Sequence, residues 1–163
     1  MTAEEIYESV TNGGASDFAL VANILRRHGG WCLIGGLAVN CYVEPVYTVD
    51  ADIVVVTEQF LAITTELRAR NAVSRLNVQL THDERYQNFI SRAEPREVLG
   101  EIVPVADLKD IVQGKVWAWS DQQRRLSKRK KDELDLIRIG EAYPELREKL
   151  PAEIVSQLEG GVK

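Results

Sequence analysis

Residues 31–56 read WCLIGGLAVNCYVEPVYTVDADIVVV, and this stretch decides the fold. Its first apolar run, Trp31–Ile34, has the length of a short strand and ends at Gly35-Gly36. Its second apolar run, Ile53–Val56, is continuous and β-branched rather than alternating, which predicts a central strand covered on both faces. The stretch therefore predicts two core strands with a glycine turn directly after the first.

A short helical turn and two aspartates occupy the residues between these strands. The turn is expected over Leu37–Val43 and should end at Glu44-Pro45, because the residue before a proline avoids the helical region. Asp50 and Asp52 stand one residue apart, so strand periodicity puts both carboxylates on one face, about 7 Å from each other. At that distance they would repel by about 2 to 3 kcal/mol if the effective dielectric constant is near 20.

The carboxylate pair has two interpretations. Asp50 and Asp52 are either polar residues at a solvated strand end or ligands of divalent cations that remove the repulsion. Two Mg²⁺ ions held by carboxylates can clamp the attacking and leaving oxygens in phosphoryl or nucleotidyl transfer. Gly35-Gly36 favours the second interpretation, because backbone N–H groups of a glycine turn between a strand and a helix can approach a triphosphate closely.

Outside this stretch, the chain is expected to form amphipathic helices and short strands. One helix should begin with Ser16 as its N-cap, and another with Thr57. Residues Arg75–Thr81 alternate as a half-buried strand, and the run 98–106 predicts another strand, in which Pro104 argues for an edge or a bulge. The remainder is expected to be helical, over Leu108–Trp119 with Asp107 at its N-terminus, over Ser127–Ala142, and after Pro151.

Length and composition limit the class of protein. With 163 residues and 45% hydrophobic content, the chain should form one domain over residues 1–163, with a sheet-containing core over about 16–106 and C-terminal helices over about 107–160. The net charge of −5 argues against a dedicated duplex-DNA binder. No apolar run approaches the roughly 18 to 20 residues of a membrane span, so we expect a cytoplasmic protein without a membrane partner. Cys32 and Cys41 lack metal-ligand spacing and should be reduced, buried thiols.

The segment IGG, a spacer from Leu37 to Val49 and the segment DADIVVV together resemble the signature of the nucleotidyltransferase superfamily related to DNA polymerase β. A looser likeness to minimal bacterial nucleotidyltransferases of the abortive-infection toxin (AbiEii-like) group extends into the C-terminal helices. The resemblance implies an α+β fold in which helices back a mixed sheet and the C-terminal helices pack alongside. It also implies that nucleotide phosphates bind Gly35 and Gly36, and that two Mg²⁺ ions bind Asp50 and Asp52.

The resemblance further implies an activity. Superfamily members transfer a nucleoside monophosphate from a nucleoside triphosphate to a hydroxyl of an RNA, a protein or a small molecule. The likeness to the abortive-infection group adds a toxin–antitoxin system, with an antitoxin as a partner. The expected function is therefore Mg²⁺-dependent nucleotidyl transfer. A catalytically degenerate protein of the same fold, which binds nucleotides or partners, is the alternative, and an unrelated α/β domain is a third possibility.

Lys115 falls in the middle of the apolar stripe of the helix expected over Leu108–Trp119. Its stem either passes the stripe to water, or its ammonium reaches an anion inside a cleft. The abortive-infection group carries a lysine at about this position, followed by a Lys-Asp-x-x-Asp helix. That likeness implies that Lys115 contacts a phosphate.

Six of the eight residues from Arg124 to Lys131 are basic. This segment is either a solvated helix start or a site that attracts a polyanion, such as an RNA acceptor, a triphosphate tail or an acidic partner. The residues expected to contact such an acceptor are Arg124, Arg125, Lys128, Arg129 and Lys130. Asp132 and Asp135 should offset part of the charge through pairs three and four residues away, and are not expected to bind metal.

A third carboxylate, which active superfamily members generally place on a neighbouring strand, is missing from the expected position. The polar face of the strand Arg75–Thr81 shows Gln79, which offers a metal only a neutral carbonyl and cannot accept a proton from the acceptor hydroxyl. Asp83, just past the strand, is four residues after Gln79, so its side chain would project from the same face if the strand were extended. It is therefore the candidate third acid if the strand continues or bulges.

Overall fold

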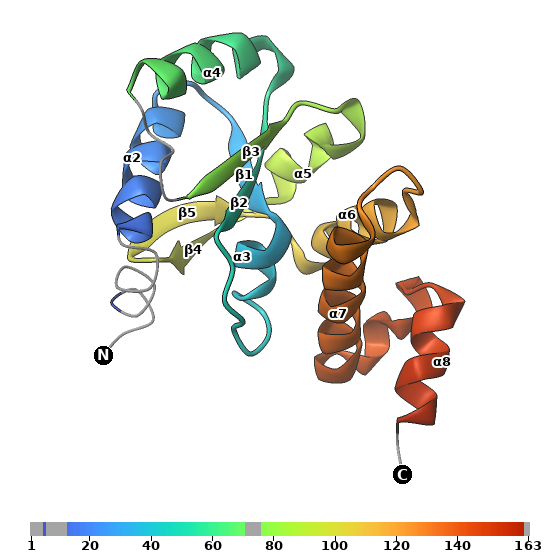
Figure 1. Ribbon diagram of the computed structural model, residues 1–163. Helices are drawn as coiled ribbons and strands as arrows, with labels where there is room; N and C mark the ends of the chain where they lie inside the picture. The colour runs from blue at the N-terminus through green and yellow to red at the C-terminus, as the bar shows by residue number, and fades with distance from the viewer. Residues whose placement is uncertain (1–4, 6–12, 71–75, 162–163) are drawn as a thin grey trace.

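A five-stranded mixed sheet forms the centre of the molecule (Figure 1). The computed structural model describes Glu5 and residues 13–70 and 76–161. The strands lie in the order β3-β2-β1-β5-β4, where β2/β3 and β1/β5 are parallel and β1/β2 and β4/β5 are antiparallel. They span Trp31–Ile34 (β1), Asp50–Val55 (β2), Asn77–Thr81 (β3), Glu94–Val98 (β4) and Glu101–Val105 (β5). The expected α+β class, with helices packed around a mixed sheet, is confirmed.

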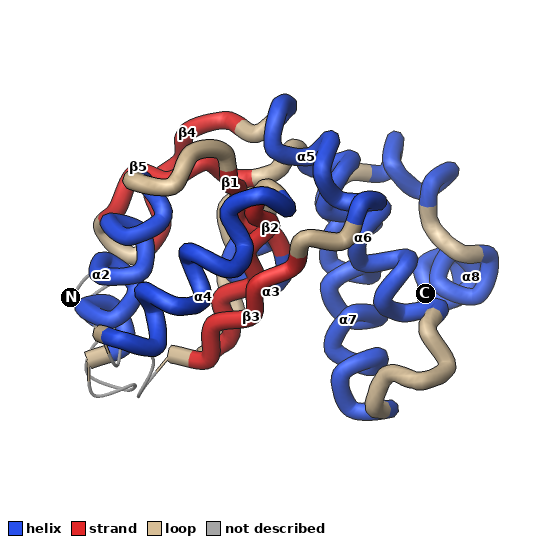
Figure 2. Tube along the Cα trace, turned by 90° about the horizontal axis from the view of Figure 1, so that it is seen from above, coloured by secondary structure: helices blue, strands red, loops and turns tan. Residues whose placement is uncertain are grey.

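Helices cover both faces of this sheet (Figure 2). On one side α2 and α4 contact each other, and on the other side α3 and α5 contact β1 and β2. Helix α6 packs against α3 and α7, and α8 packs outside α7. The helices span Gly14–Arg26 (α2), Gly35–Val39 (α3), Phe60–Ala69 (α4), Gln87–Arg92 (α5), Leu108–Ser120 (α6), Leu126–Ala142 (α7) and Ala152–Gly160 (α8).

The apolar part of β2 is buried on both faces, as its continuous apolar run predicted, and β1 beside it is buried as well. Leu33 in β1 and Ile53 in β2 lie opposite each other and are fully buried. Strand β2 begins at Asp50, three residues before the apolar run, because pairing with β1 and β3 continues through the aspartates. Ile34 faces Asp52 across the ladder. Both carboxylates therefore project from a paired strand and not from a loop that precedes it.

Two expected helix caps are wrong. Ser16 lies inside α2, whose N-cap is Gly13 at φ 109°. Thr57 begins a 3₁₀ turn, Thr57–Gln59, and its hydroxyl donates to the carbonyl of His82, which ties this turn to the end of β3. The cap at Asp107 is confirmed, because its carboxylate accepts a hydrogen bond of 2.9 Å from the amide of Lys109.

The other helices that the sequence predicted differ from expectation only at their ends, whereas α5 was not expected. The turn expected over Leu37–Val43 is α3, which begins two residues earlier because the glycines form its first turn, and ends at Val39. Helix α7 begins at Leu126, one residue earlier than expected. A 3₁₀ segment, Pro144–Lys149, separates it from α8, which follows Pro151 as expected.

The run 98–106 forms a turn and one strand of a hairpin, where a single strand was expected. Leu99 and Gly100, at φ 50° and 84°, connect β4 to β5. Pro104 lies in β5, which has neighbours on both sides, so the edge assignment is wrong; the edge strand at this side of the sheet is β4. Pro104 is tolerated because it faces Pro95, so both missing N–H donors fall at one position, and because β5 pairs with β1 at Val105.

Strand β3 is half-buried with alternating faces, as expected, although Arg75 lies outside the described residues. Both cysteines are free thiols. Cys32 is fully buried, and burial raises the pKa of its thiol to about 12, whereas Cys41 is only partly buried. Within the described segments, none of the helices has the length and apolar character required to cross a bilayer.

Candidate active site

Gly35 is the residue of the glycine turn that the structure constrains. It has a φ of +73°, and a Cβ built on it would lie 2.1 Å from Oδ2 of Asp52, so neither the backbone nor the space allows a side chain. At Gly36 the nearest atom to such a Cβ is a methyl carbon of Thr48 at 3.5 Å, an ordinary contact. The turn therefore brings the backbone of Gly35 directly against the carboxylate of Asp52.

Asp50 already has partners on both carboxylate oxygens. Oδ1 accepts a hydrogen bond of 2.9 Å from the side-chain Nδ2 of Asn77, the residue opposite it on β3, and Oδ2 lies 2.7 Å from Nζ of Lys128 on α7. A second ammonium, that of Lys131, lies 3.8 Å from the same Oδ2. Burial alone would raise the pKa of Asp50, but the hydrogen bonds from Lys128 and Asn77 outweigh it and leave the pKa below the usual value.

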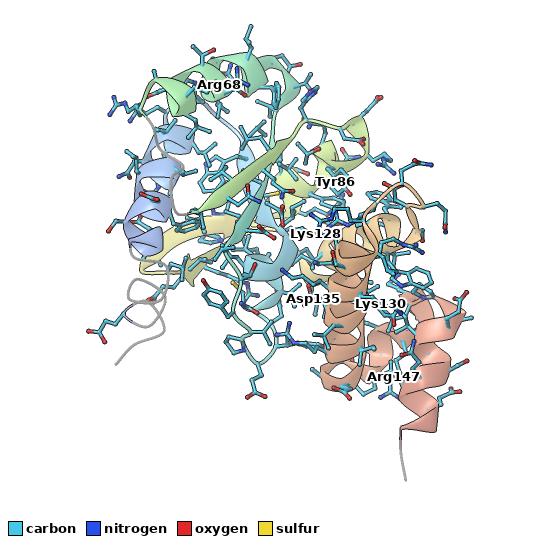
Figure 3. The ribbon with its side chains drawn as sticks, in the orientation of Figure 1. Arg68, Tyr86, Lys128, Lys130, Asp135 and Arg147 are labelled. Atoms are coloured by element: carbon cyan, nitrogen blue, oxygen red, sulfur yellow. The ribbon has the colours of Figure 1, made fainter. Side chains whose placement is uncertain are left out.

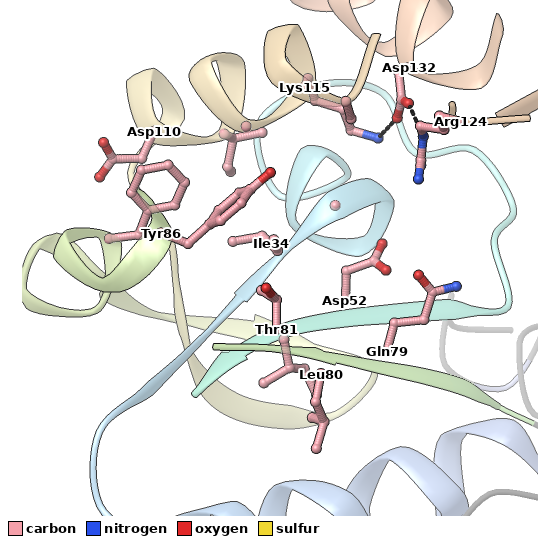
Figure 4. A pocket seen from close by; sticks show the side chains of 16 residues that line it. Ile34, Asp52, Gln79, Leu80, Thr81, Tyr86, Asp110, Lys115, Arg124 and Asp132 are labelled. Atoms are coloured by element: carbon pink, nitrogen blue, oxygen red, sulfur yellow. Dashed lines mark hydrogen bonds and ion pairs between the residues drawn. The ribbon is translucent and has the colours of Figure 1, made fainter. Parts of the chain in front are cut away.

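Asp52 is in the opposite situation. None of the residues that the structure describes donates a hydrogen bond or forms an ion pair with its carboxylate. Burial is the largest influence and raises the pKa of Asp52, opposed by the charge of Lys115 and reinforced by the charge of Asp50. Figure 4 shows the carboxylate pointing into the space between the sheet and α6, beside the amide of Gln79. An anionic group held in this way favours a cation in the neighbouring space.

That space is a cavity of about 230 Å³. One end is mainly aromatic and apolar, with Tyr86, Phe89 and Ile111 beside the paired carboxylate of Asp110, and the other end is charged (Figure 4). Gly114 of α6 keeps the aromatic end open, since a Cβ there would lie 3.2 Å from the Tyr86 ring. A smaller compartment of about 40 Å³ adjoins it and contains Asp50 and Lys128. The residues that line both spaces are Asp52, Gln79, Lys115, Arg124 and Asp132.

The ammonium of Lys115 lies at the charged end of the cavity, and its ion-pair partners are carboxylates of this chain. Its Nζ lies 2.7 Å from Asp135 and 3.0 Å from Asp132, and its side chain is 11% exposed. Arg124 binds the second oxygen of Asp132, and Arg138 binds Asp135. The interpretation in which the lysine stem reaches water is therefore wrong.

The expectation of purely local pairs for the two carboxylates holds only in part. Arg138 is three residues from Asp135, as expected, whereas the partners of Asp132 come from α6 and from the turn before α7. Both carboxylates are buried. They form a structural network that fixes the ammonium of Lys115 over the cavity.

The basic segment Arg124–Lys131 does not present one continuous face. Lys128 reaches Asp50, and Arg124 reaches Asp132. Arg129 donates to the carbonyl of Trp119, and Lys130 pairs with Glu133, while Arg125 is exposed before α7. Figure 3 places Lys128 on the side of α7 toward the sheet and Lys130 on the side toward α8. Of the five cations expected at an acceptor, two thus belong to the carboxylate site.

Asp83 does not join Asp50 and Asp52. It caps the 3₁₀ turn Glu84–Tyr86, where Oδ1 accepts from the amide of Arg85, and its carboxylate pairs with the Arg85 side chain. It lines neither compartment. The residue opposite Asp52 on β3 is Gln79. Strand alternation alone could not reveal the position of Asp83, because β3 ends at Thr81 and the chain turns away there.

The donor set fits one kind of metal site. In the described part of the chain, no group of three or more His, Cys, Asp and Glu residues is arranged to hold a metal ion. Mg²⁺, however, is commonly bound by one or two carboxylates together with substrate phosphates and water. Asp50 and Asp52, on one face of β2 and with Asp52 lacking a partner among the described residues, fit a Mg²⁺ ion that arrives with a polyphosphate.

Sequence reasoning missed the aromatic end of the cavity and the direction of Lys128. The only sequence signal for the aromatic end is Gly114 inside an otherwise regular helix, which indicates close packing. Tyr86 lies in a polar stretch without periodicity.

Neither a scan of the sequence against protein-family models nor a search of the curated proteins finds a match.

Proposed function

We propose that this protein is a Mg²⁺-dependent nucleotidyltransferase that moves a nucleoside monophosphate from a nucleoside triphosphate to an acceptor hydroxyl. The observation that carries the proposal is the carboxylate of Asp52, which the described residues leave without a hydrogen bond or ion pair, at the junction of an aromatic and a charged compartment. Gly35 is fixed against this carboxylate, and Asp50 projects from the same face of the strand.

The two ends of the cavity suit the two ends of a nucleotide. The ring of Tyr86 offers a stacking surface for a base, and the hydroxyl of Thr81 and the amide of Gln79 offer hydrogen bonds to a nucleoside. The triphosphate would extend toward Asp52, where Lys115 and Arg124 supply positive charge. Asp50 and Asp52 would hold Mg²⁺, which when bound polarises phosphoryl oxygens and neutralises their charge.

In the transfer, the acceptor oxygen bonds to the α-phosphorus while the bond from that phosphorus to the bridging oxygen breaks. Pyrophosphate leaves with the electron pair, and the hydroxyl proton passes to solvent. The chain's contribution is mainly to orient the reactants and to stabilise charge, as is usual for phosphoryl chemistry. The acceptor classes implied by the sequence resemblance are a hydroxyl of an RNA, a protein or a small molecule, with an antitoxin as regulator.

A second candidate function is nucleotide binding without transfer, within the same fold. Two observations favour it: the neutral Gln79 stands opposite Asp52, and the ammonium of Lys128 already occupies Asp50. A site of this kind would bind Mg²⁺ and a nucleotide but release the nucleotide unchanged.

The test is calorimetric binding of each of the four nucleoside triphosphates, with Mg²⁺ and with a chelator. Wild-type protein should bind at least one of them in a Mg²⁺-dependent manner, Asp52→Ala should lose this binding, and Asp83→Ala, a carboxylate outside both compartments, should retain it. Equal binding by Asp52→Ala and wild type would contradict the proposal. Transfer of an α-phosphate label to RNA or protein in a cell extract then separates the enzyme from the binding module.

A further inference from the structure

Lys128 and Asp50 form a contact that competes with the binding of a metal ion to Asp50. Nζ of Lys128 lies 2.7 Å from Oδ2 of Asp50, while Asn77 holds Oδ1. The contact spans 78 residues of sequence and joins α7 to the central sheet. An ammonium and a divalent cation repel each other, so their close approach at one carboxylate oxygen is unfavourable. A metal ion that binds Oδ2 therefore favours departure of Lys128 from this oxygen.

The formal charges around the smaller compartment are balanced. Its lining contains four carboxylates and four cations: Asp50, Asp52, Asp132, Asp135, Lys115, Arg124, Lys128 and Lys131. A free divalent cation and a free triphosphate each meet this wall without net attraction. A complex of the two brings both signs at once. It can offer a cation to the carboxylates and phosphate oxygens to the ammonium that the cation displaces.

Lys128 is the cation in this wall best placed to exchange partners. Its side chain is 31% exposed and pairs with Asp50, whereas Lys115 is 11% exposed and is held by two buried carboxylates. A lysine side chain has several rotatable bonds, so its ammonium can leave Oδ2 and still face the same compartment. Lys131 lies farther from Oδ2, at 3.8 Å, and is more exposed.

We propose that Lys128 is a triphosphate-binding residue that occupies the metal position on Asp50 until a metal–nucleotide complex arrives. As the divalent cation binds Asp50, the ammonium moves from the carboxylate to the phosphate oxygens. The same residue thus opposes binding of the metal alone and favours binding of the metal with its nucleotide. This inference rests on the proposed function for its second half, and on the Lys128–Asp50 contact alone for its first half.

The opposite signs of these two effects provide the test. Binding of Mn²⁺ alone is measured by electron paramagnetic resonance for wild type, Lys128→Ala and Lys130→Ala. Lys130 is the matched control, because it carries the same charge on the same helix and pairs with Glu133 instead. Lys128→Ala should bind Mn²⁺ roughly fivefold more tightly than wild type, and Lys130→Ala should match wild type.

The second arm measures, with Mg²⁺ present, calorimetric binding of each of four nucleoside triphosphate analogues in which a methylene group replaces the α,β-bridging oxygen. Lys128→Ala should bind the preferred analogue about tenfold more weakly than wild type, while Lys130→Ala stays unchanged. Lys128→Arg, which keeps the charge, should recover most of this affinity. Alanine is a strong helix former and Lys128 is partly exposed, so thermal unfolding should show intact variants.

The outcomes separate the two proposals. If Lys128→Ala binds Mn²⁺ no more tightly than wild type, or if it binds the analogue as well as wild type does, the exchange is overturned while the proposed function stands. If wild-type protein binds none of the analogues, the proposed function is overturned, and with it the phosphate half of the exchange. The Mn²⁺ arm still decides the metal half in that case.

Discussion

The Cα atom of Gly35 lies so close to the carboxylate of Asp52 that a Cβ on this glycine would be 2.1 Å from Oδ2. The two residues come from different elements, the start of α3 and the middle of β2. Their contact fixes the position of the carboxylate relative to the turn. The glycine that the sequence predicted as part of a phosphate-binding turn is therefore also a packing requirement of the charged site.

Gly35→Ala should destabilise the protein by about 2 to 4 kcal/mol, because the substitution combines a left-handed backbone with a steric clash. Gly29→Ala is the matched control. Gly29 has a φ of +95° but no atom within 4 Å of a Cβ, so only the backbone strain of about 1 kcal/mol is expected. Urea unfolding of both variants measures the difference. Equal losses would mean that the contact with Asp52 adds nothing.

Asp52→Asn should stabilise the protein by about 1 kcal/mol at pH 7, because burial raises the pKa of Asp52 and so disfavours its charged form. The folded state holds this proton more tightly than the unfolded state does. The protonated carboxyl group of Asp52 therefore stabilises the folded state below pH 3.8, the unfolded pKa, and this contribution is lost as pH rises through the folded pKa. The advantage of the variant should vanish as pH falls below 3.8 in urea unfolding experiments.

Asp50→Asn should have the opposite effect, a loss of about 1 kcal/mol at pH 7, because hydrogen bonds from Lys128 and Asn77 hold the pKa of Asp50 below its usual value against the effect of burial. The ionised carboxylate of Asp50 therefore stabilises the folded state above pH 3.8, and this contribution is lost as pH falls through the folded pKa. The same unfolding series serves as the measurement. Effects of the same sign at the two aspartates would contradict their assignment as one paired and one unpaired carboxylate.

Lys115→Met should destabilise the protein by about 3 to 5 kcal/mol, because it leaves the buried carboxylates of Asp132 and Asp135 without their shared ammonium. Burial alone would lower the pKa of Lys115, but these two carboxylates raise it above 10.5. The stabilisation by the charged Lys115 is therefore complete below pH 10.5 and is lost only as pH rises through the folded pKa of this lysine. The difference from wild type should stay constant between pH 7 and 10 in urea unfolding. Lys130→Met, on an exposed side chain, should change stability by less than about 0.5 kcal/mol.

The parts of the site that sequence could predict are those set by local periodicity. Alternation along one strand puts Asp50 and Asp52 on a common face, and the continuous apolar run places that strand in the core. The partners of these carboxylates could not be predicted in the same way. Lys128 reaches Asp50 only because the tertiary fold brings the start of α7 near the first residue of β2, a contact between residues 78 positions apart. Local charge spacing indicated pairs along the helix instead.

Asp83 illustrates the limit of parity as a guide to position. Counting in twos from Gln79 assigns Asp83 to the polar face, but the strand ends at Thr81 and Asp83 becomes the cap of the next turn. A capping carboxylate satisfies backbone N–H groups at its own helix and is held there by them. At this strand end, local hydrogen bonding therefore overrides the extrapolated strand pattern.

Gln79→Glu should create the third carboxylate that the site lacks, because Gln79 is the residue opposite Asp52 on the adjoining strand. Without metal, the added charge beside Asp52 should destabilise the protein by about 1 kcal/mol, because like charges face each other across the ladder. With Mn²⁺ present the same charge becomes a ligand, so metal affinity should rise about tenfold and the loss of stability should be recovered. Electron paramagnetic resonance and unfolding with and without Mn²⁺ measure both effects.

Asp83→Asn is the control for this prediction, since it removes a carboxylate from the same part of the chain but outside both compartments. It should leave Mn²⁺ affinity and nucleotide binding unchanged, because its partners are the amide and side chain of Arg85. Loss of metal binding in Asp83→Asn, together with no gain in Gln79→Glu, would instead identify Asp83 as the third acid. That result would require the end of β3 to rearrange when the metal binds.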